Sequence, residues 1–90
     1  MATHKSALKE HRRADARRLR LRHHRSRLRS AVKKFRQAMV DGDIETARGL
    51  LPETISLVDK TAKLNAIHDN AASRTKGRLT RALNRAAAQS

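Results

Sequence analysis

Arginine and lysine are the side chains of this sequence with the most obvious chemistry. The 90 residues include 22 of them against eight Asp and Glu, for a formal net charge of +14. Fourteen of these cations lie between residues 1 and 40, where the only acids are Glu10 and Asp15. A guanidinium group binds a phosphate through two parallel hydrogen bonds and also stacks on exposed bases. The composition therefore indicates that the protein binds a polyanion.

The histidines and serines give no sign of a metal centre or a nucleophile. His11 and Asp15 are four residues apart and His23 and His24 are adjacent, but no third ligand accompanies either pair at a spacing typical of metal sites. The serines have no base and orienting acid in register, and the chain has no cysteine. We expect no metal, no cofactor and no enzymatic activity. Histidines near a polyanion would instead donate to phosphates, His68 above all.

The charge is divided into three blocks along the chain. Residues 1–40 carry a net +12, residues 41–59 a net −4 and residues 60–90 a net +6. Like charges four residues apart, as in the row Lys9, Arg13 and Arg17, destabilise an isolated helix by about 0.2–0.5 kcal/mol per pair. The first block therefore needs an anionic partner. We expect the two basic blocks to share it.

Three helices are predicted to carry these blocks in one domain that spans residues 1–90. The predicted fold class is an all-α three-helix bundle with a long basic first helix. Gly42 can end the first helix in the left-handed conformation, Asp43 can cap the second, and Asn65 is the predicted cap of the third. The expected helices cover residues 4–40, 44–64 and 67–87.

The second helix contains a proline, which does not interrupt its apolar periodicity. The apolar positions recur at steps of three and four from Ile44 to Ala62, on both sides of Pro52. Proline removes a backbone hydrogen bond within a helix and bends it. We therefore predict one kinked helix rather than two short ones.

Apolar residues divide the long first helix into two parts. A dense stripe runs from Leu28 to Met39, whereas before Arg25 only an apolar residue every seventh position falls on the same seam. At 1.5 Å per residue the first helix is about 50 Å long, and the other two reach only about 30 Å each. The C-terminal half should therefore be one wall of the core. The N-terminal half should project from it as a basic arm.

The arginines of the predicted arm occupy every side of the helix. A membrane-surface helix needs a broad apolar side, which the arm lacks, and no apolar run is long enough for a transmembrane helix. Folded RNA can supply phosphates on several sides at once. Phe35 is the only aromatic residue and lies on the core stripe, so the protein has no aromatic platform for bases. We expect helices that read the RNA backbone through Arg and Lys.

Two alternative functions remain open from the residues alone. A DNA-compacting architectural protein would also be basic and helical, but it would dimerise or insert apolar wedges into the minor groove. A cationic membrane-active helix is the second alternative. Neither an exposed wedge nor a second seam is evident in the sequence.

Several short strings, read in order, resemble the bacterial small-subunit ribosomal protein family S-twenty over nearly the whole chain. The resemblance implies a three-helix bundle with an extended first helix, bound directly to 16S ribosomal RNA as an early-assembling structural protein. It implies one copy per ribosome, a cytoplasmic and ribosome-associated location, and contacts with neighbouring ribosomal proteins. The strings are Lys5-Ser6-Ala7, Arg25-Ser26, Lys33-Lys34, Gly42-Asp43, Val58-Asp59-Lys60, Ile67-His68, Asn70-Ala71, Arg74, Lys76 and Leu79-Thr80.

Compared with the family, this chain has more Arg and His in the arm, and it has Gly77 where a helix former is expected.

The predicted RNA-binding residues come from two sources. The resemblance implies RNA contacts by Lys5, Ser6, Arg25, Ser26, Lys33, Lys34, Lys60, His68, Asn70, Arg74 and Lys76. Charge alone adds Lys9, Arg12, Arg13, Arg17, Arg18, Arg20, Arg22, Arg27, Arg29, Lys63, Arg78 and Arg81.

Overall fold

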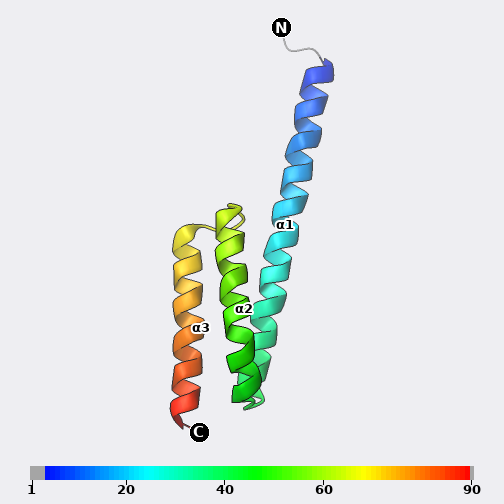
Figure 1. Ribbon diagram of the computed structural model, residues 1–90. Helices are drawn as coiled ribbons and strands as arrows, with labels where there is room; N and C mark the ends of the chain where they lie inside the picture. The colour runs from blue at the N-terminus through cyan, green and yellow to red at the C-terminus, as the bar shows by residue number, and fades with distance from the viewer. Residues whose placement is uncertain (1–3, 90) are drawn as a thin grey trace.

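The structure is a computed structural model that describes residues 4–89 and consists of three helices, with no strand in that range. Residues 1–3, the start of the predicted arm, and residue 90 lie outside the described part. The prediction of an all-α three-helix bundle is confirmed (Figure 1). The molecule is elongated, with extents of 66 × 21 × 15 Å. The helices are α1 (His4–Val40), α2 (Ile44–Lys63) and α3 (Asp69–Gln89).

The turn between α1 and α2 has the predicted chemistry. Gly42 takes a left-handed φ of 74°. Its N–H donates to the carbonyl of Met39 at 3.1 Å, and the N–H of Asp43 donates to that of Ala38 at 2.9 Å. This pair of bonds closes the end of α1. Glycine suits the left-handed position there because it has no Cβ. The carboxylate of Asp43 then accepts from the N–H of Thr46 at 3.2 Å, which confirms its role as the cap of α2.

The cap at Asp43 makes the stability of the free protein depend on pH. Hydrogen bonds from the Thr46 side chain and, to a smaller extent, from its backbone hold the pKa of Asp43 below its ordinary value. A carboxyl group with a lowered pKa in the folded state stabilises the fold at higher pH and loses this contribution as pH falls. We expect the urea midpoint to fall below about pH 4 for this reason. The variant Asp43→Asn keeps an acceptor at every pH, so it should show a weaker decline; an identical decline would contradict this assignment.

The turn between α2 and α3 differs from the prediction. Asn65 does not cap α3 but ends α2, with a left-handed φ of 61° and its N–H donating to the carbonyl of Ala62 at 2.9 Å. The cap of α3 is His68, whose Nδ1 accepts from the N–H of Asn70 at 3.0 Å. Asparagine suits both a helix start and a left-handed helix end, so the sequence did not decide between them. As a result α3 covers 69–89 rather than 67–87, and α2 ends at Lys63.

The middle helix buries two faces, because α2 packs against both α1 and α3. The predicted stripe captured Ala47, Val58 and Ala62, which are buried. It missed Thr54 and Thr61, which are only 2% and 1% exposed. Their hydroxyls donate to carbonyls one turn earlier, of Leu50 at 2.8 Å and Leu57 at 2.6 Å. These bonds satisfy the polar groups, so that threonine can be buried like valine.

The core consists of two small clusters, each built from all three helices. The buried residues of α1 are Leu28, Phe35 and Ala38, so burial on this helix begins at Leu28, as predicted. The first cluster contains Phe35, Ala38, Ala47, Leu79 and Leu83, and the second contains Leu28, Val58, Ala62 and Ala72.

Two residues that disfavour helices lie inside helices. Helix α2 continues through Pro52 as one helix, which confirms that prediction, while the kink itself stays a prediction. In α3, the nearest group to a Cβ added at Gly77 would be the guanidinium of Arg81, at 3.2 Å. The glycine therefore leaves room for this arginine to lie back against the helix.

The N-terminal part of α1 projects from the bundle, as predicted (Figure 1). We call residues 4–24 the arm. Two of its leucines are largely exposed: Leu8 is 56% exposed and Leu19 is 65% exposed.

We expect amide hydrogens in the arm of the free protein to exchange much faster than those near Phe35. Burial supplies most of the stability of helices in proteins, and the arm has little burial and many like charges. Addition of a polyanion should slow their exchange. Strong protection of residues 8–20 without any polyanion would show that the arm is stable by itself.

Candidate nucleic-acid interface

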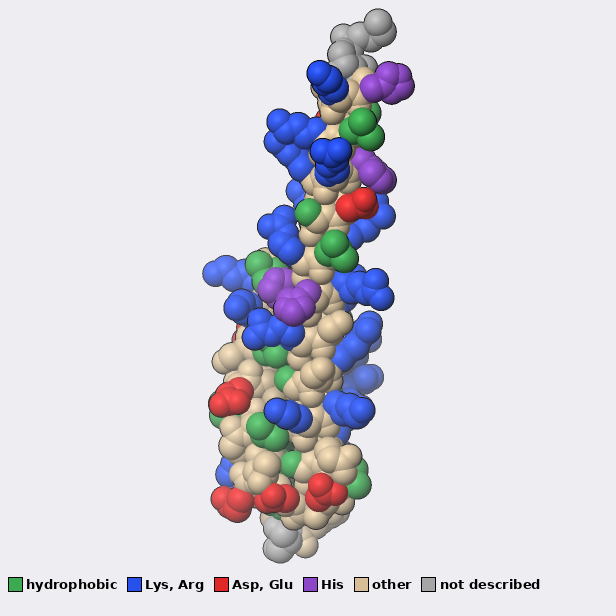
Figure 2. Space-filling view, turned by 90° about the vertical axis from the view of Figure 1, so that its right-hand side faces the viewer, with side chains coloured by type: hydrophobic (Ala, Val, Ile, Leu, Met, Phe, Trp, Pro, Cys, Tyr) green, Lys and Arg blue, Asp and Glu red, His purple; other side chains and the backbone are tan. Residues whose placement is uncertain are grey.

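Basic side chains cover α1 along its length, and acidic side chains gather at the end of the molecule away from the arm (Figure 2). Each predicted Lys and Arg of the arm is exposed. The acids of the turn that joins α1 to α2, Asp41 and Asp43, are exposed, as is Glu45 in the first turn of α2. Glu45 forms an ion pair of 2.8 Å with Arg48. The molecule is thus electrically polarised, with its positive end at the arm.

Few of the arm cations are neutralised within the protein. Asp15 lies 3.3 Å from Nε2 of His11 and 3.7 Å from the guanidinium of Arg18. No other ion pair forms in the arm among residues 4–89. The remaining arginines are exposed on several sides of the helix, where phosphates can approach them.

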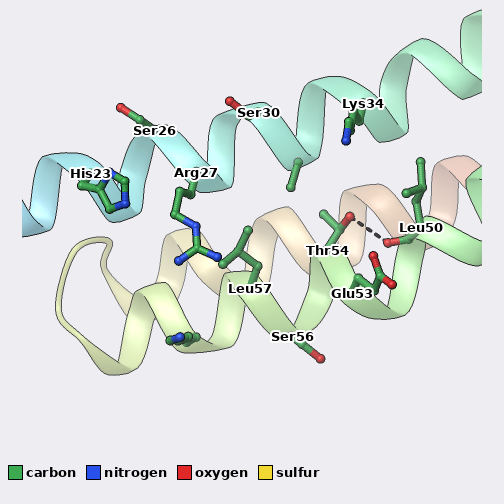
Figure 3. A pocket seen from close by; sticks show the side chains of 12 residues that line it. His23, Ser26, Arg27, Ser30, Lys34, Leu50, Glu53, Thr54, Ser56 and Leu57 are labelled. Atoms are coloured by element: carbon green, nitrogen blue, oxygen red, sulfur yellow. Dashed lines mark hydrogen bonds between the residues drawn. The ribbon is translucent and has the colours of Figure 1, made fainter.

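A groove of about 770 Å³ runs between α1 and α2 and collects cations from both helices (Figure 3). Helix α1 contributes the cations Arg27 and Lys34, and α2 contributes Lys60. The imidazole of His23 also belongs to the lining, and Glu53 is the one carboxylate in it. The Arg27 side chain extends from α1 towards α2 beside Leu57 (Figure 3). Apolar side chains such as Leu50 and Leu57 form part of the lining.

The cations of this groove lack protein partners. Within the described residues neither Arg27 nor Lys60 forms an ion pair, although both line the same groove. A phosphate between them would receive hydrogen bonds from an ammonium and a guanidinium group. Charge predicted Arg27 and the resemblance predicted Lys60, but only the packing of α2 on α1 places them in one groove.

The groove also contains hydroxyl groups that the sequence prediction missed. Ser26 was predicted, whereas Ser30 and Ser56 were not, and all three belong to the lining. In Figure 3 the side chains of Ser26 and Ser30 follow one another along the edge of α1 that points away from α2. The available signal was the spacing of four residues from Ser26 to Ser30 to Lys34, which places them on one helix face.

A second groove, of about 530 Å³, lies on the other flank of α1, where Thr75 of α3 contributes to the lining. Its cations are Arg29, Lys33 and Arg36. Arg36 was not among the predicted residues, although its spacing from Arg29 and Lys33 places it on the same side of the helix. Helix α1 therefore presents cations on both flanks of the bundle as well as on the arm.

The predicted residues of the second basic block are exposed, with one exception. The exposed ones are Lys60, Lys63, His68, Asn70, Arg74, Arg78 and Arg81. Lys76 is partly buried, and its Nζ lies 2.7 Å from the carboxylate of Asp59, so it links α3 to α2. A contact of Lys76 with RNA would have to compete with this ion pair. His68 uses Nδ1 in capping α3, which leaves Nε2 as the ring nitrogen that can donate.

Other classes of site find no support in the described residues. No three His, Asp or Glu side chains come close enough together to hold a metal ion. None of the three helices is both long enough and apolar enough to cross a bilayer.

Comparison with known proteins places this architecture in a family. Residues 2–84 match the family model described as ribosomal protein S20. A protein of Christiangramia forsetii named small ribosomal subunit protein bS20 is 49% identical over 81 residues, which is 90% of this chain and 94% of the relative. Relatives of the same name are 43% identical in Persephonella marina (98% of this chain, 96% of the relative) and 39% identical in Aquifex aeolicus (99% and 95%). The chain therefore belongs to the ribosomal protein S20 family.

Proposed function

We propose that this protein is a structural constituent of the small ribosomal subunit that binds directly to 16S ribosomal RNA. The observation that carries the proposal is the arm, a helix with exposed arginines on several sides and almost no acid to neutralise them. Membership of a ribosomal protein family supports the same conclusion. It also supports a structural rather than an enzymatic role.

In the proposed mechanism the bundle holds one orientation on the RNA while the arm inserts between RNA helices. Phosphates of neighbouring RNA helices repel one another, and cations between them offset this repulsion. The grooves on the two flanks of α1 would bind further stretches of backbone, with Arg27 and Lys60 in one and Lys33 in the other. The protein thereby braces the folded RNA during assembly.

The proposal includes one copy of the protein per small subunit, located with ribosomes in the cytoplasm. Contacts with neighbouring ribosomal proteins are part of it. No metal, cofactor or small-molecule substrate is required, because the chemistry is neutralisation of phosphate charge.

Cosedimentation tests the proposal directly. The native protein should sediment with small ribosomal subunits at low salt and be released only at high salt, because binding releases counterions. If the protein stays in the unbound fraction at low salt, the proposal is wrong.

Competition experiments test the alternatives. Folded 16S ribosomal RNA should compete for the protein far better than duplex DNA at matched salt, and equal affinity would favour a DNA-compacting role. Leakage of anionic vesicles at low protein concentration would support a membrane-active role.

A further inference from the structure

The arm forms a corner with the turn between α2 and α3, at the point where α1 leaves the bundle (Figure 1). This corner is a cleft of about 690 Å³. Its lining combines Arg17, Arg20, Leu21 and His24 of α1 with Leu64 and Asn65 of the turn. Arg17 and Arg20 were predicted from charge, whereas the sequence prediction of RNA contacts contained none of the others.

The α1 side of the corner continues the core-facing stripe of the helix. Arg17, Arg20, Leu21 and His24 follow one another at steps of three, one and three residues, and the next buried position is Leu28. These spacings place them on one face. From Leu28 to the C-terminal end of α1, that face is covered by α2 and α3. Before Leu28 the face is only partly covered, because Leu21 and His24 are half-buried and Arg17 and Arg20 are exposed. Its composition changes there from apolar to a mixture of leucine, histidine and arginine.

The turn contributes a partly exposed apolar side chain and an amide that makes no hydrogen bond to the described part of the protein. Leu64 is 41% exposed although it is a large apolar residue. The side chain of Asn65 makes no hydrogen bond to the described part of the protein, while its backbone, at a φ of 61°, completes the end of α2. Glycine fills such a position at least as well. The turn therefore requires the backbone conformation at residue 65 but not the amide.

The chemistry of the lining selects one kind of ligand. Leu21 and Leu64 offer apolar surface to the face of a base, and the amide of Asn65 offers both a donor and an acceptor to its edge. Arg17 and Arg20 offer guanidinium groups to the adjoining phosphates. In double-stranded RNA the faces of the bases are hidden by stacking, and only unpaired bases can be splayed out and read on their edges. The volume lies within the range of small-ligand pockets, about 300–1,000 Å³.

We infer that the corner between the arm and the turn of residues 64–68 binds one unpaired nucleotide of the RNA to which the protein is bound. This inference rests on the proposed function and adds to it a feature of the RNA that the protein recognises. Recognition then includes one base contact, beyond the reading of backbone shape by Arg and Lys. The bundle also gains a fixed position along the RNA, because an extruded nucleotide occurs at a defined place.

Two uncharged substitutions in the full-length protein test the inference. Asn65→Gly removes the amide and keeps the left-handed end of α2, and Leu64→Ser removes the apolar wall. Asn84→Ser is the control, since Asn84 is an exposed amide of α3 that lines neither the corner nor the two grooves. For each variant, the affinity for 16S ribosomal RNA is measured over a range of salt concentrations. Chemical probing of the bases then shows which unpaired nucleotides the protein protects.

We expect Asn65→Gly and Leu64→Ser each to weaken binding by about fivefold or more, the size typical of one lost base contact. The dependence of affinity on salt should not change, because neither variant removes a charge. Protection should be lost at one unpaired nucleotide, and Asn84→Ser should behave like the unmodified protein.

The possible results separate this inference from the proposed function. If both corner variants keep the affinity and the protection pattern of the unmodified protein, the nucleotide site does not exist, while binding of 16S ribosomal RNA stands. If affinity falls but protection is lost broadly, the corner is not a site for a single nucleotide. If the unmodified protein itself does not bind 16S ribosomal RNA, the proposed function fails and the inference fails with it.

Discussion

Neutralising the arm is expected to lower the affinity of the protein for 16S ribosomal RNA by about a thousandfold at roughly 0.1 M salt. Each phosphate that the arm neutralises releases about 0.7 counterion from single-stranded RNA, so about seven contacts give a log–log salt slope on the order of −5. Loss of six cations should make the slope less negative by about 4 and leave the share that comes from the two grooves. The measurement is the affinity as a function of salt. In the variant, glutamine replaces six arginines of the arm: Arg12, Arg13, Arg17, Arg18, Arg20 and Arg22.

Glutamine is a suitable replacement because its helix propensity is close to that of arginine. The control is the double variant Arg48→Gln and Arg85→Gln. Arg48 lies in α2 and Arg85 in α3, so both are outside the arm, and neither lines a groove. Each control substitution should change the slope far less than each arm substitution. A nearly flat salt dependence of the unmodified protein, or equal effects per charge in the two variants, would contradict the role of the arm.

Removal of the Phe35 side chain is expected to destabilise the free protein by about 3–5 kcal/mol. Phe35 is 0% exposed and packs in the cluster with Ala38, Ala47, Leu79 and Leu83, which belong to all three helices. Two of these four neighbours are alanines, whose side chains are too short to fill the cavity. A domain of this size is stable by only about 5–13 kcal/mol, so Phe35→Ala removes a large part of the total. Urea unfolding followed by helical circular dichroism measures the loss.

Leu19→Ala is the matched control for this substitution. Leu19 lies on the same helix but is 65% exposed, so its truncation should change the free energy of unfolding by less than about 0.5 kcal/mol. A loss below about 1 kcal/mol in Phe35→Ala would mean that the bundle does not depend on this side chain. Bound RNA should partly offset the destabilisation, because a ligand that binds only the folded state stabilises it.

The helices, the first turn and the division of α1 could be predicted because each depends on local properties of the chain. The stripe from Leu28 to Met39 has helical spacing, and Gly42 is suited to the left-handed conformation that ends a helix. Because α1 is longer than α2 and α3, a part of α1 has to project beyond them. These features need no knowledge of which helix faces which.

The errors occurred where two local solutions were equally good or where a helix has two neighbours. The local sequence allows Asn65 either to start α3 or to end α2. In the folded protein Asn65 ends α2 and His68 caps α3. On α2, one apolar stripe was predicted, but the middle helix of the bundle must bury a face against each neighbour. Thr54 and Thr61 are buried for this reason, and their hydroxyls are satisfied within α2.

By itself the sequence determined the sign of the partner, the place of the excess charge and the helices that carry it, because charge and periodicity are properties of neighbouring residues. Tertiary structure decided which distant residues share a site. Packing of α2 on α1 places Lys60 in the groove of Arg27, and the turn after α2 brings Asn65 to Arg17. The approach of α3 to α2 pairs Lys76 with Asp59. Such combinations depend on which faces are buried and where each helix ends, and the spacing within a single helix does not contain that information.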